Sequence, residues 1–322
     1  MRRRTTLGAA VTRRLWIAAL TAGAVVGSLA GAVPASAHPL PTPPAVSVDG
    51  RVKVPSNYTT AQLAALPQTT VTVREGGAAV TDTGVLLETL VTDAAPAYPS
   101  SLLNAKNELL RVTATVRGAG GQGVTFAVGE LDANFGNHPA LIALSRDGRR
   151  IAGRPELVVP GDRFPARFVP QVSEVTVGIA TASATNTTPS PGSPVVVMDG
   201  SRTVTLSAAV LARLPSETLA VSFAGPGGEQ THTEVGPPLW EVLTVAGVSP
   251  GPNRWVAAVG SDSYVATVTP AEQFVGGRPL QLSLVEDGVA LAQPRLVADG
   301  DVKGGRDVSD VVDLYTGTGP AR

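Results

Sequence analysis

Two stretches of the chain repeat one phrase: residues 61–73 read AQLAALPQTTVTV, and residues 209–221 read AVLARLPSETLAV. They begin 148 positions apart (209 − 61 = 148). Further segments pair around them in the same order and with small gaps: VSVDGRVKV (46–54) with VVVMDGSRTVTL (195–206), GVLLETLVTDAAP (84–96) with GPPLWEVLTVAGVSP (236–250), ALIALSRDGRRI (140–151) with LQLSLVEDGVAL (280–291), and LVVPGDRFPARFVPQVSEVTV (157–177) with LVADGDVKGGRDVSDVVDL (296–314). Chance similarity does not preserve such an order, so the chain contains two copies of one unit.

Each copy has the pattern of short helices among strands. A threonine cap, Leu63 and Leu66 at helical spacing and then Pro67 predict a short helix in TTAQLAAL (59–66), which recurs at 207–214. TTVTV (69–73) alternates as a strand does, and GVLLETLV (84–91) predicts a second short helix. The 35 glycines and 27 prolines favour turns over long helices. We predict a strand-dominated α+β fold; two β-sandwich modules are the alternative.

The repeat also predicts the domain organisation. A length of 322 residues suits two domains, each with its own core. We assign the first copy to residues 46–178 and the second to 195–315. The Ser/Thr/Pro-rich stretch within 179–194 is typical of an exposed linker, and residues 316–322 are expected to form a tail.

The first 37 residues have the pattern of an export signal. An arginine-rich start is followed by the apolar stretch LWIAALTAGAVVGSLAGAV (15–33) and by a small-residue cleavage site, Ala35-Ser36-Ala37. The mature chain is expected to begin at His38, with a proline-rich stub over 38–45. A membrane anchor is the alternative, because the apolar run approaches spanning length. TRRLWIA (12–18) resembles a twin-arginine signal, and both this route and the general secretory route remain open.

Composition excludes several classes of function. The 26 acidic and 25 basic residues give a net charge of −1, and no basic stripe follows the first fourteen positions, which argues against a nucleic-acid partner. The chain has no cysteine, which excludes disulfides, thiolate metal sites and cysteine nucleophiles. We expect an extracellular or envelope-associated protein that is not membrane-bound once the signal is cleaved.

The order of these motifs resembles the molybdopterin-binding domain of the sulfite-oxidase type, in the short form found in exported bacterial oxidoreductases. The resemblance rests on an early valine-rich strand, the AQLAALPQTTVTV and GVLLETL phrases, a late Asp-Gly turn, and LVVPGD followed by a terminal strand. It covers most of both copies, about 250 residues. It implies two tandem copies of that fold.

The resemblance also implies a site, and the residue that this site most needs is missing. In the family, a cysteine just after the TTVTV-like strand binds molybdenum; here those stretches read VREGG (73–77) and VSFAGPGG (221–228). Glu75 is a candidate ligand for a hard metal, although an exposed turn carboxylate is the ordinary alternative. In the family, basic residues near PGDRFPAR (160–167) face a pocket for anionic groups, which makes Arg163 and Arg167 candidate pocket residues; pairing with a neighbouring Asp at the surface is the alternative.

Two histidines are further candidates for an acid–base or metal-binding role. His138 lies near Glu130, Asp132 and Asn134 in the sequence, a set that suits an acid–base pair or a metal site. A histidine that caps a turn is the simpler interpretation. His232 is expected to be an exposed turn residue, and no multi-histidine metal site is predicted.

The sequence therefore predicts an exported protein with the resembled fold that has lost the metal ligand and binds something without catalysing oxo transfer. The expected partner is a small anionic ligand or a component of the cell envelope. Two alternatives remain: an oxidoreductase that holds molybdopterin without a cysteine ligand, and a structural or adhesive module of the envelope.

Overall fold

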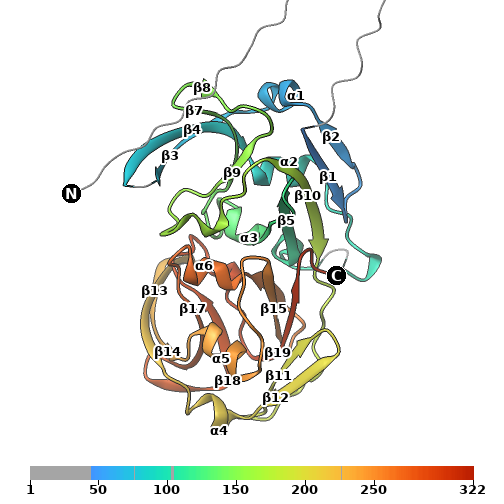
Figure 1. Cartoon of the computed structure of the whole chain (residues 1–322). Coiled ribbons are helices and arrows are strands. Elements are labelled where there is room, and N and C mark those ends of the chain that lie inside the picture. Colours follow the sequence, from blue (N-terminus) through green and yellow to red (C-terminus); the bar gives the residue numbers. More distant parts are fainter. Residues whose placement is uncertain (1–44, 76, 103–104, 226) are drawn as a thin grey trace, which may run out of the picture. The chain divides into compact units, whose positions relative to one another are not determined.

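The strands of the first copy build two sheets, both visible in Figure 1. The computed structural model describes residues 45–75, 77–102, 105–225 and 227–322. One sheet has the order β2-β1-β10-β5-β6 and the other the order β3-β4-β7-β8, with β9 paired to β7. The strands are β1 (Val46–Gly50), β2 (Ser56–Tyr58), β3 (Thr69–Glu75), β4 (Ala78–Leu86), β5 (Val112–Gly118), β6 (Gly123–Ala127), β7 (Leu141–Arg146), β8 (Arg149–Arg150), β9 (Glu156–Val158) and β10 (Val172–Ile179). The helices are α1 (Thr60–Ala65), α2 (Leu87–Asp93) and α3 (Val128–Leu131), with 3-10 turns η1 (Ser100–Leu102), η2 (Glu108–Arg111) and η3 (Pro165–Arg167).

The second copy repeats this topology. Its sheets have the orders β12-β11-β19-β15-β16 and β13-β14-β17-β18. The strands are β11 (Val195–Asp199), β12 (Arg202–Leu206), β13 (Glu217–Gly225), β14 (Gly228–Gly236), β15 (Arg254–Gly260), β16 (Val265–Val268), β17 (Leu280–Glu286), β18 (Val289–Ala298) and β19 (Val311–Thr318); the helices are α4 (Ala208–Leu211), α5 (Leu239–Val245) and α6 (Pro270–Phe274), with the 3-10 turn η4 (Gly304–Arg306). In both copies the first strand pairs in parallel with the last, β1 with β10 and β11 with β19. The strand-dominated α+β class is confirmed.

The repeated phrase forms the expected helix in each copy. Thr59 caps α1 in a capping box: its Oγ1 accepts from the Gln62 amide at 3.2 Å, and Gln62 Oε1 accepts from the Thr59 amide at 2.8 Å. Ser207 caps α4 through the Val210 amide at 3.3 Å. Each helix then buries one leucine of the phrase, Leu63 or Leu211, in the core of its own copy.

Both copies have an arginine on the second sheet that pairs with two carboxylates, but the arginine lies on different strands in the two copies. In the first copy Arg146 on β7 pairs with Asp82 at 3.0 Å and with Glu156 at 3.2 Å. In the second copy the arginine has moved to β18, where Arg295 pairs with Glu234 at 3.4 Å and with Glu286 on β17. The strands pair in the same way in both copies, although the arginine lies on β7 in the first copy and on β18 in the second. The geometry of the sheet therefore does not depend on which strand carries the cation.

The segment between the copies and the end of the chain are attached to the fold. Within the predicted linker, the Thr185 amide donates to the Asp313 carboxylate at 2.6 Å, and Ala180 is buried. The structure differs from the predicted tail over residues 316–322. The strand β19 continues to Thr318, and the Ala321 amide donates to Thr113 Oγ1 at 2.9 Å. This approach is possible because Gly178 has no side chain: a Cβ there would lie 2.2 Å from the Ala321 nitrogen.

Both copies belong to one compact unit, Thr42–Arg322. Leu110 of the first copy is part of the core of the second, and Thr267 Oγ1 donates to the Leu110 carbonyl at 2.7 Å. The Arg111 guanidinium donates to the Ser263 carbonyl at 3.0 Å. The predicted signal 1–37 and the stub up to residue 44 lie outside the described residues. Among the residues that the structure describes, no helix is long and apolar enough to cross a membrane.

Candidate functional site

The two segments that the sequence singled out meet at one cavity in the first copy. It has a volume of about 330 Å³ and is called here the first-copy cavity. The β3 end contributes Arg74, and the stretch around η3 contributes Pro165 and Phe168. The complete lining is Arg74, Arg146, Glu156, Leu157, Pro165, Phe168, Val169 and Pro170.

One wall of this cavity carries the charged side chains Arg74, Arg146 and Glu156, and the other is apolar. Arg146 is held by Asp82 and Glu156, so its guanidinium has a fixed position. Arg74 is exposed, and within the described part of the chain it forms no ion pair. The other wall consists of buried or half-buried apolar side chains, Leu157, Phe168 and Val169 among them. Such a lining suits a ligand with one anionic group and an apolar body.

Of the residues predicted from the sequence, Arg163 and Arg167 are not among the described residues that line the cavity. The backbone of Glu75 pairs with Ala78 at the end of the β3–β4 hairpin, and its side chain lies outside the described part. Arg163 is exposed; its amide donates to the Val275 carbonyl at 2.8 Å, and its guanidinium to the Gly277 carbonyl at 3.4 Å. Arg167 is completely buried. The sequence missed Arg74, although strand alternation already placed it on the face opposite Val73.

Arg167 is the centre of a buried ionic cluster, called here the first cluster. Its guanidinium grips Asp162 with two hydrogen bonds of 2.9 and 2.5 Å and donates to Glu130 at 2.6 Å. His138 Nδ1 lies 3.0 Å from the same Glu130 oxygen. Arg167 therefore pairs with the neighbouring Asp162, as the sequence allowed, but in the interior instead of at the surface. The structure also brings Glu130 and His138 together, as their sequence spacing suggested.

The second copy has an equivalent second cluster. Arg306 grips Asp301 with bonds of 2.8 and 2.6 Å and donates to Glu272 at 2.6 Å. Arg278 stands where the first copy has His138, in the same Xaa-Pro pair, and its guanidinium donates to Asp301 at 3.1 Å. Bidentate arginine–carboxylate pairs of this kind are the strong form of ion pair and fix both partners.

Burial and the neighbouring charges in each cluster shift the pKa values of its glutamate carboxyl groups. Burial disfavours the charged form of Glu130, but the Arg167 guanidinium and the His138 ring outweigh burial and lower the pKa of Glu130 to about 2. Burial raises the pKa of Glu272, and the nearby Glu130 carboxylate raises it further against the attraction of Arg306. The two clusters are therefore close enough to interact. The arrangement is that of a structural anchor, since every charged group in it already has a charged partner.

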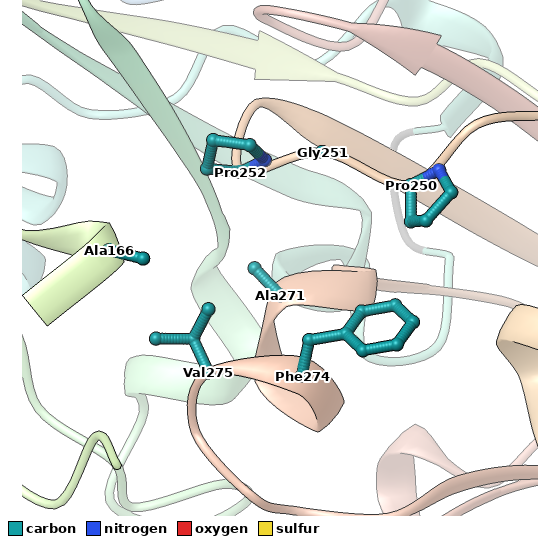
Figure 2. Close-up of a pocket in the computed structure, with 7 residues that line it drawn as sticks. All are labelled: Ala166, Pro250, Gly251, Pro252, Ala271, Phe274 and Val275. Carbon is teal, nitrogen blue, oxygen red and sulfur yellow. The ribbon is translucent and has the colours of Figure 1, made fainter. Parts of the chain in front are cut away.

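A second cavity, of about 270 Å³, is almost entirely apolar. Figure 2 shows Phe274, Ala271 and Val275 of the α6 region facing the loop Pro250–Pro252, with Ala166 of η3 at the side. Phe274 also packs against Trp240, with ring centroids 5.8 Å apart. The lining offers no charged group that could select or orient a polar ligand.

The first copy replaces this aromatic pair with two carboxyl groups. In the repeat, Trp240 corresponds to Glu88 and Phe274 to Asp132. Burial raises the pKa of Glu88 to about 7, and the charge of Asp132 and a hydrogen bond to it contribute. The first copy therefore has a carboxyl pair at the position where the second copy has an apolar contact.

The donor set does not fit the molybdenum centre that the family resemblance implies. Such a centre needs a soft thiolate, and the chain contains no cysteine at any position. The structure places Arg74, a cation, beside the position where the ligand would be required. Among the described residues, no group of three or more His, Asp and Glu is arranged to hold a metal ion.

Comparisons with known proteins give distant likenesses of fold among solved structures. No family model matches the chain, and no curated protein is similar to it. Among solved structures, the chain is similar to the crystal structure of the sulfane dehydrogenase SoxCD from Paracoccus pantotrophus, with 14% sequence identity, a TM-score of 0.32, and coverage of 84% of this chain and 74% of that one. At this TM-score the likeness is a weak resemblance of fold and carries no argument about activity.

Proposed function

We propose that this chain is an exported, non-catalytic binding protein whose first-copy cavity receives a small anion with an apolar body. The observation that carries the proposal is the pairing of Arg74 with an apolar wall in one cavity. A guanidinium binds carboxylates and other oxyanions through paired N–H donors. The apolar wall gains from covering a hydrocarbon surface, so the ligand class combines both features.

The proposal of a non-catalytic role rests on the side chains around this cavity. Arg146 is paired with both Asp82 and Glu156, and Arg167 behind the wall is paired with Glu130 and Asp162. A nucleophile or general base needs a group with a free lone pair in reach of the ligand. The lining supplies none apart from Glu156, whose charge is already engaged by Arg146.

Calorimetric titration with benzoate, a carboxylate on an apolar ring, tests this function. We expect saturable binding that weakens about tenfold in Arg74→Ala, because one charge-assisted contact is lost at a partly solvated site. Arg149→Ala is the matched control: this arginine is exposed on β8 of the same sheet and does not line the cavity. Equal benzoate affinity in Arg74→Ala and the unmodified protein would refute the site, and equal affinity for sulfate would refute the apolar part of the ligand class.

Metal content separates this proposal from the oxidoreductase alternative. We expect protein exported by a host with an intact cofactor pathway to carry no stoichiometric molybdenum and to turn over neither sulfite nor sulfoxides, since no thiolate completes the coordination. Elemental analysis and pterin fluorescence after gel filtration provide the measurement. A stoichiometric molybdenum content would overturn the non-catalytic proposal and make Glu75 the first residue to substitute.

A further inference from the structure

His138 has a hydrogen-bond acceptor at each ring nitrogen. Nδ1 lies 3.0 Å from the Glu130 carboxylate, and Nε2 lies 2.9 Å from the Pro160 carbonyl oxygen. A neutral imidazole carries one N–H and can donate to only one of them, whereas an imidazolium carries two. The surroundings of His138 are therefore satisfied only when the ring is protonated.

The charge balance of the first cluster leads to the same requirement. Glu130, Asp162 and Arg167 are all buried side chains and together carry a net charge of −1. The Asp162 carboxylate also lies 3.6 Å from His138 Nε2. Uncompensated buried charge is costly, and a protonated His138 removes it. Glu272, the charged group beyond Glu130, is already paired with Arg306 and does not change this balance.

The second copy has a cation, Arg278, at the position equivalent to His138. Glu272, Asp301 and Arg306 carry the same net charge of −1, and there Arg278 supplies the compensating cation. An arginine remains charged throughout the accessible pH range, so the second cluster has its compensating cation at every pH at which Glu272 and Asp301 are ionised. The first cluster is neutral only at a pH where histidine is charged, and histidine changes its charge between about pH 5 and 8.

His138 also holds one end of the wall of the first-copy cavity. Its Nε2 contacts the Pro160 carbonyl, and the chain continues from there through Gly161 and Asp162 to Pro165 and Phe168, which line the cavity. Gly161 has a φ of 90°, and a Cβ at this position would lie 3.3 Å from Nε2, so the turn is packed closely against the ring. Loss of the second N–H would leave the Pro160 carbonyl without this donor.

We propose that His138 is a pH-dependent latch on the first-copy cavity, an inference that rests on the proposed function for its effect on binding. The protonated ring ties residues 160–168 to α3 and keeps the cavity wall in place. The neutral ring keeps its one N–H toward the charged Glu130, the stronger acceptor, so loss of the proton removes the donor to Pro160 and leaves the cluster with a buried negative charge. The stabilisation is thus present at acidic pH and is lost as the pH rises through the histidine range.

The test compares the unmodified protein with His138→Arg, which copies the second cluster, and with the control His232→Gln. His232 is half-buried on β14, pairs with Asp287 at 2.9 Å and with Glu286 at 3.5 Å, and forms no hydrogen bond or ion pair with the described residues of either cluster. The free energy of unfolding and the affinity for benzoate are measured at pH 5.5 and pH 8. We expect the unmodified protein and His232→Gln to lose stability and about tenfold in affinity at pH 8, and His138→Arg to lose less of both.

Other groups titrate in the same range and must be separated. Burial raises the pKa of Asp307 to about 7, and Glu88 also titrates near 7, so both contribute to a loss of stability as the pH rises. They are present in all three proteins, so the difference between the profiles isolates His138. Parallel profiles for His138→Arg and the unmodified protein would overturn the latch.

Two further measurements keep the inference open to refutation if His138→Arg does not fold. The imidazole nitrogen resonances of His138 in the unmodified protein should show both nitrogens protonated at pH 5.5, and a neutral tautomer at that pH would overturn the latch. Arg278→His should lose more stability between pH 5.5 and 8 than the unmodified protein does. If stability follows the prediction but benzoate does not bind at either pH, the latch stands and the proposed function fails.

Discussion

Replacing Arg306 with methionine is expected to lower the free energy of unfolding by about 3–5 kcal/mol, the range for breaking a buried ion pair from one side. The change leaves Asp301 and Glu272 without their main cation, and both carboxylates are almost completely buried. Urea unfolding at pH 7 provides the measurement, with an unchanged dependence on denaturant as evidence that the same surface is exposed. The loss should shrink at acidic pH, because protonation removes the uncompensated charges.

The cause can be separated from simple loss of packing. Arg306→Met combined with Glu272→Gln leaves Asp301 paired with Arg278 and the cluster without net charge, so this double variant should be less destabilised than Arg306→Met alone. Arg167→Met is the equivalent change in the first copy, leaves the buried Glu130 and Asp162 without their shared guanidinium, and should be similarly costly. Arg149→Ala, at an exposed position, should change stability by less than about 0.5 kcal/mol. A loss below about 1 kcal/mol in both methionine variants would contradict the structural role of the clusters.

The sequence predicted the elements that depend on local patterns. Capping residues and apolar spacing specify α1 and α4 within a few residues, and alternation specifies β3. The sequence predicts a tail over residues 316–322, whereas β19 continues to Thr318 and Ala321 is buried. The difference arises because the conformation of this segment depends on a distant partner. Nothing within residues 316–322 indicates that Ala321 bonds Thr113, which lies 208 positions away.

The burial of Arg167 could not be predicted from its own neighbourhood. Arginine is almost never completely buried unless it is paired, and its second partner, Glu130, lies 37 positions away. A usable signal was present, however, in the comparison of the two copies. Glu130, Asp162 and Arg167 recur as Glu272, Asp301 and Arg306, while neighbouring positions such as Glu88 and Trp240 have diverged. Charged residues that persist between diverged copies indicate a shared structural requirement.

A second large effect is expected from a methyl group at the glycine near the end of the strand that precedes the second helix of each copy, in Gly84→Ala on β4 and Gly236→Ala on β14. A Cβ at Gly84 would lie 2.0 Å from the Ile142 carbonyl oxygen, and a Cβ at Gly236 would lie 2.2 Å from the Leu282 carbonyl oxygen. Both obstacles are backbone atoms of the adjacent strand, β7 or β17, so a side-chain rotation cannot relieve them. The strands have to separate, and we expect each variant to lose about 3 kcal/mol or more in free energy of unfolding.

Gly227→Ala is the matched control for these variants, because no described atom lies within 4 Å of the added methyl and its φ is not in the left-handed region. It should change stability by less than about 0.5 kcal/mol. Since both copies belong to one compact unit, Gly84→Ala and Gly236→Ala should each shift a single unfolding transition followed by tryptophan fluorescence and circular dichroism. The three tryptophans comprise Trp16 in the predicted signal and Trp240 and Trp255 in the second copy. If Gly84→Ala shifted circular dichroism but left the fluorescence transition unchanged, the copies would unfold independently and their shared contacts, Leu110 in the second core among them, would contribute little to stability.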